Sequence, residues 1–254
     1  MRIGIDIGST AAKAAVLDGD DIAYTVVVPT GFNGVDAAMR LADDLRAWGV
    51  DPIACSEDVV ATGYGRVSVP YAGKTITEIT CHGRGAAYLF GGDGTVIDVG
   101  GQDTKVIQLA GGKVRKLVMN DKCAAGTGKF IEVMANRLGL TIEELFELAQ
   151  VGDPIPISSL CTVFAESEVI NYMGEGRSRK DLAAGVIDSV ALKVTTLVQR
   201  KELQDTVIIT GGFSDNEFFA GLLSKKLGQT AHAMPLGRYA GAYGAALLAR
   251  DHSR

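Results

Sequence analysis

The sequence predicts an α/β fold made of two similar halves, each of which opens with three antiparallel strands. The first observation is an internal repeat, because Ile5-Asp6-Ile7-Gly8 returns later in the chain as Ile97-Asp98-Val99-Gly100. The second is that a lysine, Lys13 or Lys105, follows each copy in the same register. The third is that apolar residues at helical spacing dominate the sequence after each set of strands.

Each copy of the repeat predicts the same three strands. An apolar strand runs into a small-residue turn, a second strand follows, and a hairpin signal, Asp18-Gly19 or Gly111-Gly112, leads to a third. The expected strands are 3–7, 11–17 and 22–28 in the first half and 95–99, 104–109 and 114–119 in the second.

The rest of each half is predicted to be mostly helical, with two further short strands at 58–62 and 206–209. Apolar spacing predicts helices at 35–48, 84–90, 130–138, 142–149, 164–173, 182–203, 217–227 and 239–249. Gly49 supplies a C-terminal stop for the first of them. No low-complexity linker separates the halves, so a hinge of packed helices is expected. We predict a first lobe of residues 1–90, completed by the C-terminal helix at 239–254, and a second lobe of residues 91–238.

Composition narrows the class of protein. With 254 residues, 47% hydrophobic residues and 32 glycines, the chain is expected to form two moderate cores with many tight turns. Met1-Arg2-Ile3-Gly4 does not open a signal peptide, and no segment reaches the roughly 20 apolar residues of a membrane span. We therefore expect a cytoplasmic protein that does not bind a membrane. A net charge of −5 without a basic block argues against nucleic acid as a partner.

The cysteines do not look like a disulfide framework, because they form no close pair. They are Cys55, Cys81, Cys123 and Cys161. Cys123 stands out, since the turn Gly126-Thr127-Gly128 and an apolar helix follow it. The first turn of a helix has unpaired N–H groups and a positive dipole end, which stabilise a thiolate. The residues alone leave open whether this thiol is a ligand or a nucleophile.

Both copies of the repeat have the residues of a phosphate-binding turn. Asp6 is followed by Gly8, Ser9 and Thr10, and Asp98 is followed by Gly100, Gly101, Gln102 and Asp103. Such turns offer N–H groups and hydroxyls to phosphate, with a carboxylate placed for Mg²⁺. A glycine-rich hairpin turn is the alternative for one copy, but duplication favours a polyphosphate site. The pair Gly211-Gly212 follows a strand and is expected to lie against adenosine.

These turns and the small-residue helices resemble the superfamily of actin, sugar kinases and heat-shock chaperone ATPases, whose two lobes have ribonuclease H-like cores. Within it, the sequence resembles the activator ATPases (component A, BadF/BadG/BcrA/BcrD type) of 2-hydroxyacyl-CoA dehydratases. The segments that carry this resemblance are 63–66, 100–103, 119–128 and 161–168. The resemblance implies a homodimer with one [4Fe-4S] cluster at the interface, held by Cys123 and Cys161 of each chain.

The resemblance and the turn chemistry together suggest roles for individual residues. Asp6 and Asp98 would hold Mg²⁺ through its waters, and Gln102 would orient the attacking water. His82 is expected to open the helix before the second turn. It is either an alternative to Gln102 for orienting the attacking water or a hydrogen-bonded hinge residue. Lys13 is a candidate phosphate contact, although Lys13 and Lys105 also suit a solvent-facing position. Cys55 and Cys81 are expected to be buried small hydrophobic residues rather than ligands.

The implied function is an ATPase that donates one electron at low potential to an iron–sulfur dehydratase, with ferredoxin or flavodoxin as its own electron source. The reductase ATPase of a double-cubane cluster protein or of an aromatic acyl-CoA reductase is the alternative within the family. A small-molecule kinase and a regulatory ATPase with zinc on the interface cysteines are the alternatives from other classes.

Overall fold

The computed structural model describes residues 1–158, 161–198 and 203–251. The chain divides into two compact units: unit 1 contains Met1–Val96, Ile107–Leu117 and Met234–Arg254, and unit 2 contains Ile97–Val106 and Val118–Ala233. The lobe boundaries expected from the sequence stay a prediction. Within the described ranges, no helix has both the length and the apolar character needed to cross a membrane.

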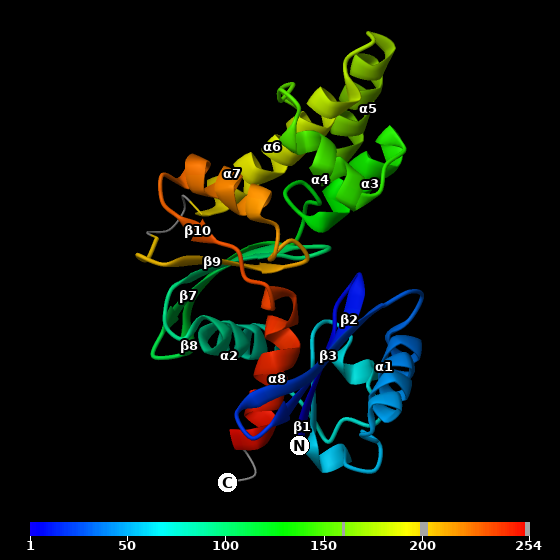
Figure 1. Ribbon diagram of the computed structural model, residues 1–254, viewed down its shortest axis with the longest axis vertical. Coiled ribbons are helices and arrows are strands. Elements are labelled where there is room, and N and C mark those ends of the chain that lie inside the picture. Colours follow the sequence, from blue (N-terminus) through cyan, green and yellow to red (C-terminus); the bar gives the residue numbers. More distant parts are fainter. Residues whose placement is uncertain (159–160, 199–202, 252–254) are drawn as a thin grey trace. The chain divides into compact units, whose positions relative to one another are not determined.

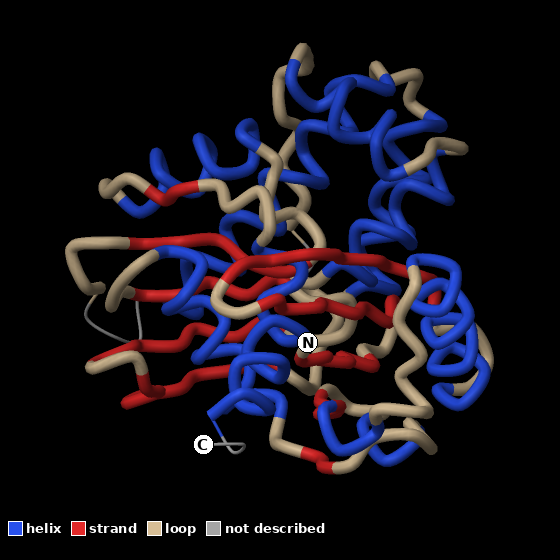
Figure 2. The backbone as a smooth tube through the Cα atoms, turned by 60° about the horizontal axis from the view of Figure 1, so that its bottom comes forward, coloured by secondary structure: helices blue, strands red, loops and turns tan. Residues whose placement is uncertain are grey.

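The first sheet has the strand order β3-β2-β1-β4-β5 (Figure 2). Its strands are β1 (Arg2–Ile7), β2 (Ala11–Asp18), β3 (Asp21–Pro29), β4 (Val59–Thr62) and β5 (Lys74–Thr75). β1, β2 and β3 pair antiparallel, as predicted, and β4 joins the other edge of β1 in parallel. β5 was not predicted, because its two residues are exposed and show no apolar pattern.

The second sheet repeats this plan with the order β10-β9-β6-β7-β8. Its strands are β6 (Thr95–Val99), β7 (Thr104–Ala110), β8 (Lys113–Asn120), β9 (Val207–Gly211) and β10 (Ala231–His232). In both sheets three successive strands lie side by side, and a strand from later in the chain pairs with the first of them. The internal repeat of the sequence is therefore a repeat of topology.

Unit 1 has its core between the first sheet and helix α1 (Gly34–Trp48), which packs on β1, β2 and β3 (Figure 1). Asn33 caps this helix, and Gly49 ends it in the left-handed region with φ 110°. Short 3₁₀ helices follow at Ser56–Asp58 and Arg66–Ser68, and a third lies at Gly237–Tyr239. The predicted helix 35–48 is confirmed.

Helices α2 (Glu78–Phe90) and α8 (Ala240–Asp251) pack closely in the same unit. Added Cβ atoms at Gly85 and Gly244 would lie 1.9 Å from Ala240 O and 1.7 Å from Cys81 O. α2 begins earlier than the predicted residue 84, because this packing outweighs the low helix propensity of its glycines. The prediction that His82 opens this helix is wrong, because His82 lies inside α2 and is buried.

Unit 2 contains the larger core, formed by the second sheet and five helices. They are α3 (Gly128–Leu138), α4 (Ile142–Gln150), α5 (Thr162–Gly174), α6 (Arg179–Val198) and α7 (Glu217–Leu227). α6 supplies Val186, Ile187, Val190 and Val194 to this core, all fully buried. Part of the predicted helix 182–203 falls on 199–202, outside the described residues.

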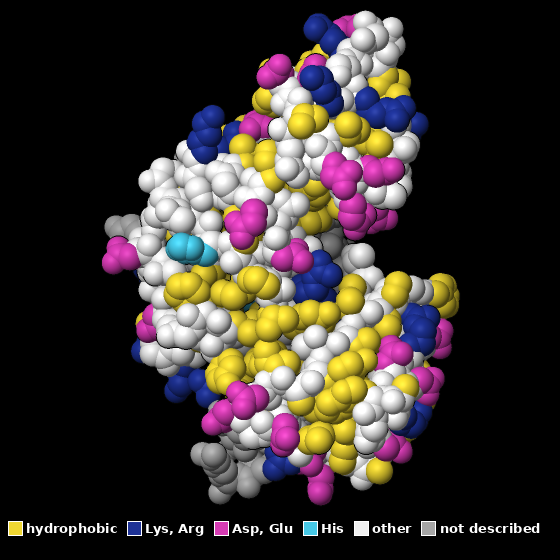
Figure 3. All heavy atoms as spheres, viewed as in Figure 1, with side chains coloured by type: hydrophobic (Ala, Val, Ile, Leu, Met, Phe, Trp, Pro, Cys, Tyr) yellow, Lys and Arg dark blue, Asp and Glu magenta, His cyan; other side chains and the backbone are white. Residues whose placement is uncertain are grey.

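Charged side chains of both signs are spread over the face drawn in Figure 3, with hydrophobic side chains between them. The acidic excess of the sequence is therefore not gathered in one region of that face.

Candidate functional site

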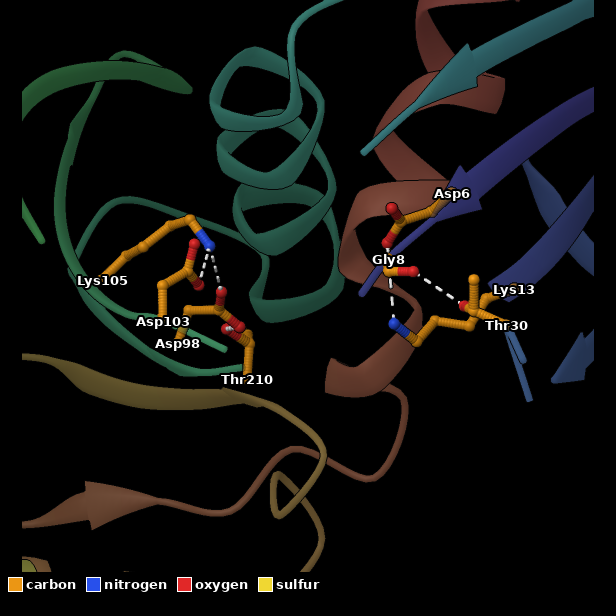
Figure 4. Close-up of polar contacts among 8 residues, drawn as sticks. All are labelled: Asp6, Gly8, Lys13, Thr30, Asp98, Asp103, Lys105 and Thr210. Atoms are coloured by element: carbon orange, nitrogen blue, oxygen red, sulfur yellow. Dashed lines mark hydrogen bonds and ion pairs between the residues drawn. The ribbon is translucent and has the colours of Figure 1, made fainter. Parts of the chain in front are cut away.

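In unit 1, the Asp6 carboxylate lies near the end of β1 and is 8% exposed. Lys13 Nζ on β2 lies 3.8 Å from Asp6 Oδ2, so Lys13 faces the carboxylate rather than solvent (Figure 4). Glycines border this carboxylate, since a Cβ at Gly63 would lie 2.4 Å from Oδ1 and one at Gly241 would lie 2.6 Å from Oδ2. The backbone approaches Asp6 too closely to accept side chains at these two positions.

The turn after β1 is held by a threonine that sequence reasoning missed. Thr30 Oγ1 donates to Gly8 O at 2.7 Å (Figure 4). Thr30 N also donates to Thr10 O at 2.9 Å. Gly8 N donates to Ala11 O at 3.2 Å, while Ser9 and Thr10 are exposed. The turn is thus fixed at its base and leaves two hydroxyls accessible.

In unit 2, the corresponding aspartate is part of a buried ionic cluster. Lys105 Nζ lies 3.4 Å from Asp98 Oδ2 and 2.5 Å from Asp103 Oδ1, and the three residues are 2–4% exposed. Thr210 Oγ1 donates to Asp98 Oδ1 at 3.1 Å (Figure 4). The solvent-facing alternative for Lys105 is wrong, because two carboxylates draw the ammonium inward and compensate its desolvation.

A glycine at the end of a parallel strand contacts the aspartate strand in each unit. Gly211, with φ +89°, would place a Cβ 2.3 Å from Val99 O. Gly63, with φ +86°, would place one 2.5 Å from Ile7 O. Gly63 and Gly211 were not predicted to occupy equivalent positions, although Thr-Gly follows an apolar strand at both places. Next to Gly211, Gly212 N donates to Val99 O at 3.2 Å.

The turn between β6 and β7 contains the other predicted residues of the second copy. Gly100 N donates to Asp103 O at 2.9 Å, which closes the turn. Gly101 is half-buried, whereas Gln102 is exposed. The predicted turn residues of each copy therefore lie together within their own unit.

Two of the cysteines lie in unit 2, shortly before helices. Cys161 is the exposed N-cap of α5. Cys123 is half-buried in the loop between β8 and α3. It precedes the α3 N-cap Thr127, so a turn separates Cys123 from the helix, as predicted. The residues between Cys123 and Thr127 form a turn instead of extending α3.

The other two cysteines lie in unit 1. Cys81 is fully buried, as expected, and burial raises the pKa of its thiol to about 11. Cys55 is half-buried, so the expectation that it is buried is wrong. The pKa of Cys55 is also raised, first by burial and then by the negative charge of Asp51. Burial therefore disfavours the thiolate, the form that binds a metal, at both residues.

Comparison with known proteins agrees with this geometry. Residues 3–249 match the BadF/BadG/BcrA/BcrD ATPase family. The chain belongs to this family. It is 43% identical over 254 residues to the activator of lactoyl-CoA dehydratase from Anaerotignum propionicum, covering 98% of this chain and 97% of the relative.

Two solved structures of similar ATPases extend the comparison. Component A of the Acidaminococcus fermentans (R)-2-hydroxyglutaryl-CoA dehydratase superposes with a TM-score of 0.93 at 39% identity, over 100% of this chain and 99% of that one. The activator of 2-hydroxyisocaproyl-CoA dehydratase from Clostridium difficile, with bound ADPNP, superposes with a TM-score of 0.92 at 37% identity, over 99% of this chain and 95% of that one. A ROK family glucokinase at 18% identity shares the fold alone, with a TM-score of 0.62. The predicted family and the two-lobed fold class of actin and the sugar kinases are confirmed.

Proposed function

We propose that this ATPase is an ATP-dependent one-electron donor that activates a 2-hydroxyacyl-CoA dehydratase. The observation that carries the proposal is that Cys123 and Cys161, neither of them fully buried nor in a disulfide, lie in the unit that also contains the second aspartate turn. The similar activators, one of them solved with ADPNP, support both the nucleotide and the kind of partner.

The residues proposed to bind MgATP are those of the two aspartate turns and the glycine pair. Asp6 and Asp98 hold Mg²⁺ through its waters, and Lys105 keeps Asp98 in place by its ion pair. Gln102 orients the attacking water, and Lys13 contacts a phosphate through the ammonium that now rests near Asp6. The remaining contacts come from Gly8, Ser9 and Thr10, from Gly100, Gly101 and Asp103, and, against adenosine, from Gly211 and Gly212.

Cys123 and Cys161 fit half of a [4Fe-4S] site. Neither residue is fully buried, neither is in a disulfide, and Cys161 is exposed. A second copy of the chain supplies the two further thiolates that the cluster needs. When bound, the cluster supplies a low-potential electron. We propose ferredoxin or flavodoxin as its source and an iron–sulfur dehydratase as its acceptor.

The cysteine assignment is tested by anaerobic purification of Cys123→Ala, Cys161→Ala and the control Cys55→Ala. The first two variants are expected to lose the visible absorption of the cluster and its iron, while calorimetry shows that MgADPNP still binds. Cys55→Ala is expected to keep both. A wild-type protein that contains zinc instead of iron, or a Cys123→Ala variant that retains the cluster, would contradict the proposal.

A further inference from the structure

The loop that carries Cys123 is held through its backbone carbonyls by side chains. Asn120 Nδ2 donates to Cys123 O at 2.8 Å and to Ala125 O at 3.0 Å. Thr127 Oγ1 donates to Ala124 O at 2.7 Å. Asn120 and Thr127 flank the loop itself, so these bonds fix its shape without tying it to another part of the unit.

The carbonyl of Gly126 is held from elsewhere, by Thr104 on β7. Thr104 is 1% exposed, directly follows Asp103 of the aspartate turn, and donates from Oγ1 to Gly126 O at 2.6 Å. Lys193 of α6 covers the same glycine, since a Cβ at Gly126 would lie 2.7 Å from Lys193 Cγ. A cavity of about 100 Å³ adjoins the contact and leaves space for the loop to shift.

Two backbone bonds join the same parts of the unit. Gly128 N donates to Gly100 O at 2.9 Å, and Lys129 N donates to Gly101 O at 2.8 Å. The first turn of α3 thus uses N–H groups, which have no partner inside the helix, to bind the carbonyls of the aspartate turn. Three hydrogen bonds, at residues 126, 128 and 129, therefore connect residues 100–104 to the end of the cysteine loop and the start of α3.

We propose that Thr104 is a positioning residue that couples nucleotide binding at the aspartate turn to the conformation of the Cys123 loop. The inference rests on the function proposed above, because it requires the turn to contact phosphate. A nucleotide that moves Gly100 and Gly101 moves the start of α3 with them. The Thr104 hydroxyl makes the loop follow, and it is the one link of the three that a side-chain substitution removes.

Hydrogen–deuterium exchange of the full chain, purified anaerobically, tests this coupling. MgADPNP is expected to change the exchange rate of peptide 123–129 about fivefold or more in the wild type, the lower end of typical coupling energies. Thr104→Val, which keeps the shape and removes the donor, is expected to abolish the change in residues 123–126, and Thr104→Ser to restore it. Calorimetry on the same samples confirms that the nucleotide binds.

Thr127→Val is the matched control, because Thr127 is also a buried threonine but donates only within the loop. It is expected to raise exchange of the peptide with and without nucleotide, and to preserve the difference between the two states. A wild-type protein that binds MgADPNP with unchanged exchange at 123–129 overturns the inference alone, whatever the variants do. A Thr104→Val protein that keeps the full difference also overturns it. A wild type that binds no nucleotide overturns the proposed function as well.

Discussion

At the scale of single residues, the Lys105 side chain lies in an environment that the fold creates. Its ammonium lies between the carboxylates of Asp98 and Asp103, and all three are almost fully buried. A buried charge is tolerated when hydrogen-bonded partners of opposite sign surround it. Carboxylates outnumber the ammonium in this cluster, which suits a group that attracts hydrated Mg²⁺.

Lys105→Met is expected to destabilise the protein by about 3–5 kcal/mol, because it leaves two buried carboxylates without their cation. Guanidinium unfolding followed by circular dichroism measures the loss. Lys129→Met is the control, since Lys129 forms an exposed ion pair with Glu132, and its effect is expected to stay below about 1 kcal/mol. Equal effects of the two substitutions would contradict the role given to Lys105.

Asp93 predicts a pH dependence of stability. Its carboxylate accepts from Gly112 N at 2.9 Å and from Gly111 N at 2.7 Å, and these bonds lower its pKa below the ordinary 3.8. A carboxyl group whose pKa is lower in the folded state than in the unfolded state stabilises the fold at pH values above its unfolded pKa. That stabilisation is lost as the pH falls through its folded pKa. Asp93→Asn is therefore expected to be less stable than the wild type at neutral pH.

The difference in free energy of unfolding between Asp93→Asn and the wild type is expected to shrink once the pH falls below 3.8. Urea unfolding at neutral and acidic pH measures it. A gap between Asp93→Asn and the wild type that is constant with pH would show that the charge of Asp93 has no part in the effect.

The sequence predicted the residues of both turns but not their partners. Asp6, Asp98 and their glycines stood out because they repeat with chemistry suited to phosphate. Thr30 and Thr210 did not, since each is distant in sequence from the turn that it bonds and carries no local signal. Strand register left Lys13 and Lys105 ambiguous, because alternation says which face a residue takes but not which groups lie there.

At the scale of elements, close contacts at glycine decide how α8 packs in unit 1. An added Cβ at Gly244 would collide with Cys81 O of α2, and one at Gly4 would lie 1.8 Å from Ala242 O. α8 therefore touches both α2 and β1 through positions without a side chain. Helical spacing of apolar residues predicted most helices. Alternation of apolar and polar residues did not predict the strands β5 and β10, because two residues are too few to show a period.

Gly244→Ala is expected to cost about 1–3 kcal/mol, because the helices must separate to admit the methyl group. Gly221→Ala in α7 is its control, since nothing lies within 4 Å of the added Cβ. That control is expected to gain about 0.5–1 kcal/mol from helix propensity. Thermal unfolding compares the two. A neutral Gly244→Ala variant would show that close packing of α2 and α8 is not required.

At the scale of the whole molecule, two sheets of one topology differ in the residues around them. Each presents an aspartate at the end of a strand and a glycine behind it, and Cys123 and Cys161 lie in unit 2. The sequence predicted the three leading strands of each sheet, because the repeat is a local pattern. It could not predict the three hydrogen bonds from the aspartate turn to the cysteine loop, which join residues that only the fold brings together.

In the proposed function, ATP hydrolysis by this protein drives an electron into a dehydratase. The most direct measurement mixes the anaerobically reduced protein with the dehydratase components for lactoyl-CoA, 2-hydroxyglutaryl-CoA and 2-hydroxyisocaproyl-CoA, and follows dehydration with MgATP or MgADPNP. We predict dehydration by at least one of them with MgATP and none with MgADPNP. Dehydration that starts equally well without nucleotide, or with MgADPNP, would contradict the account.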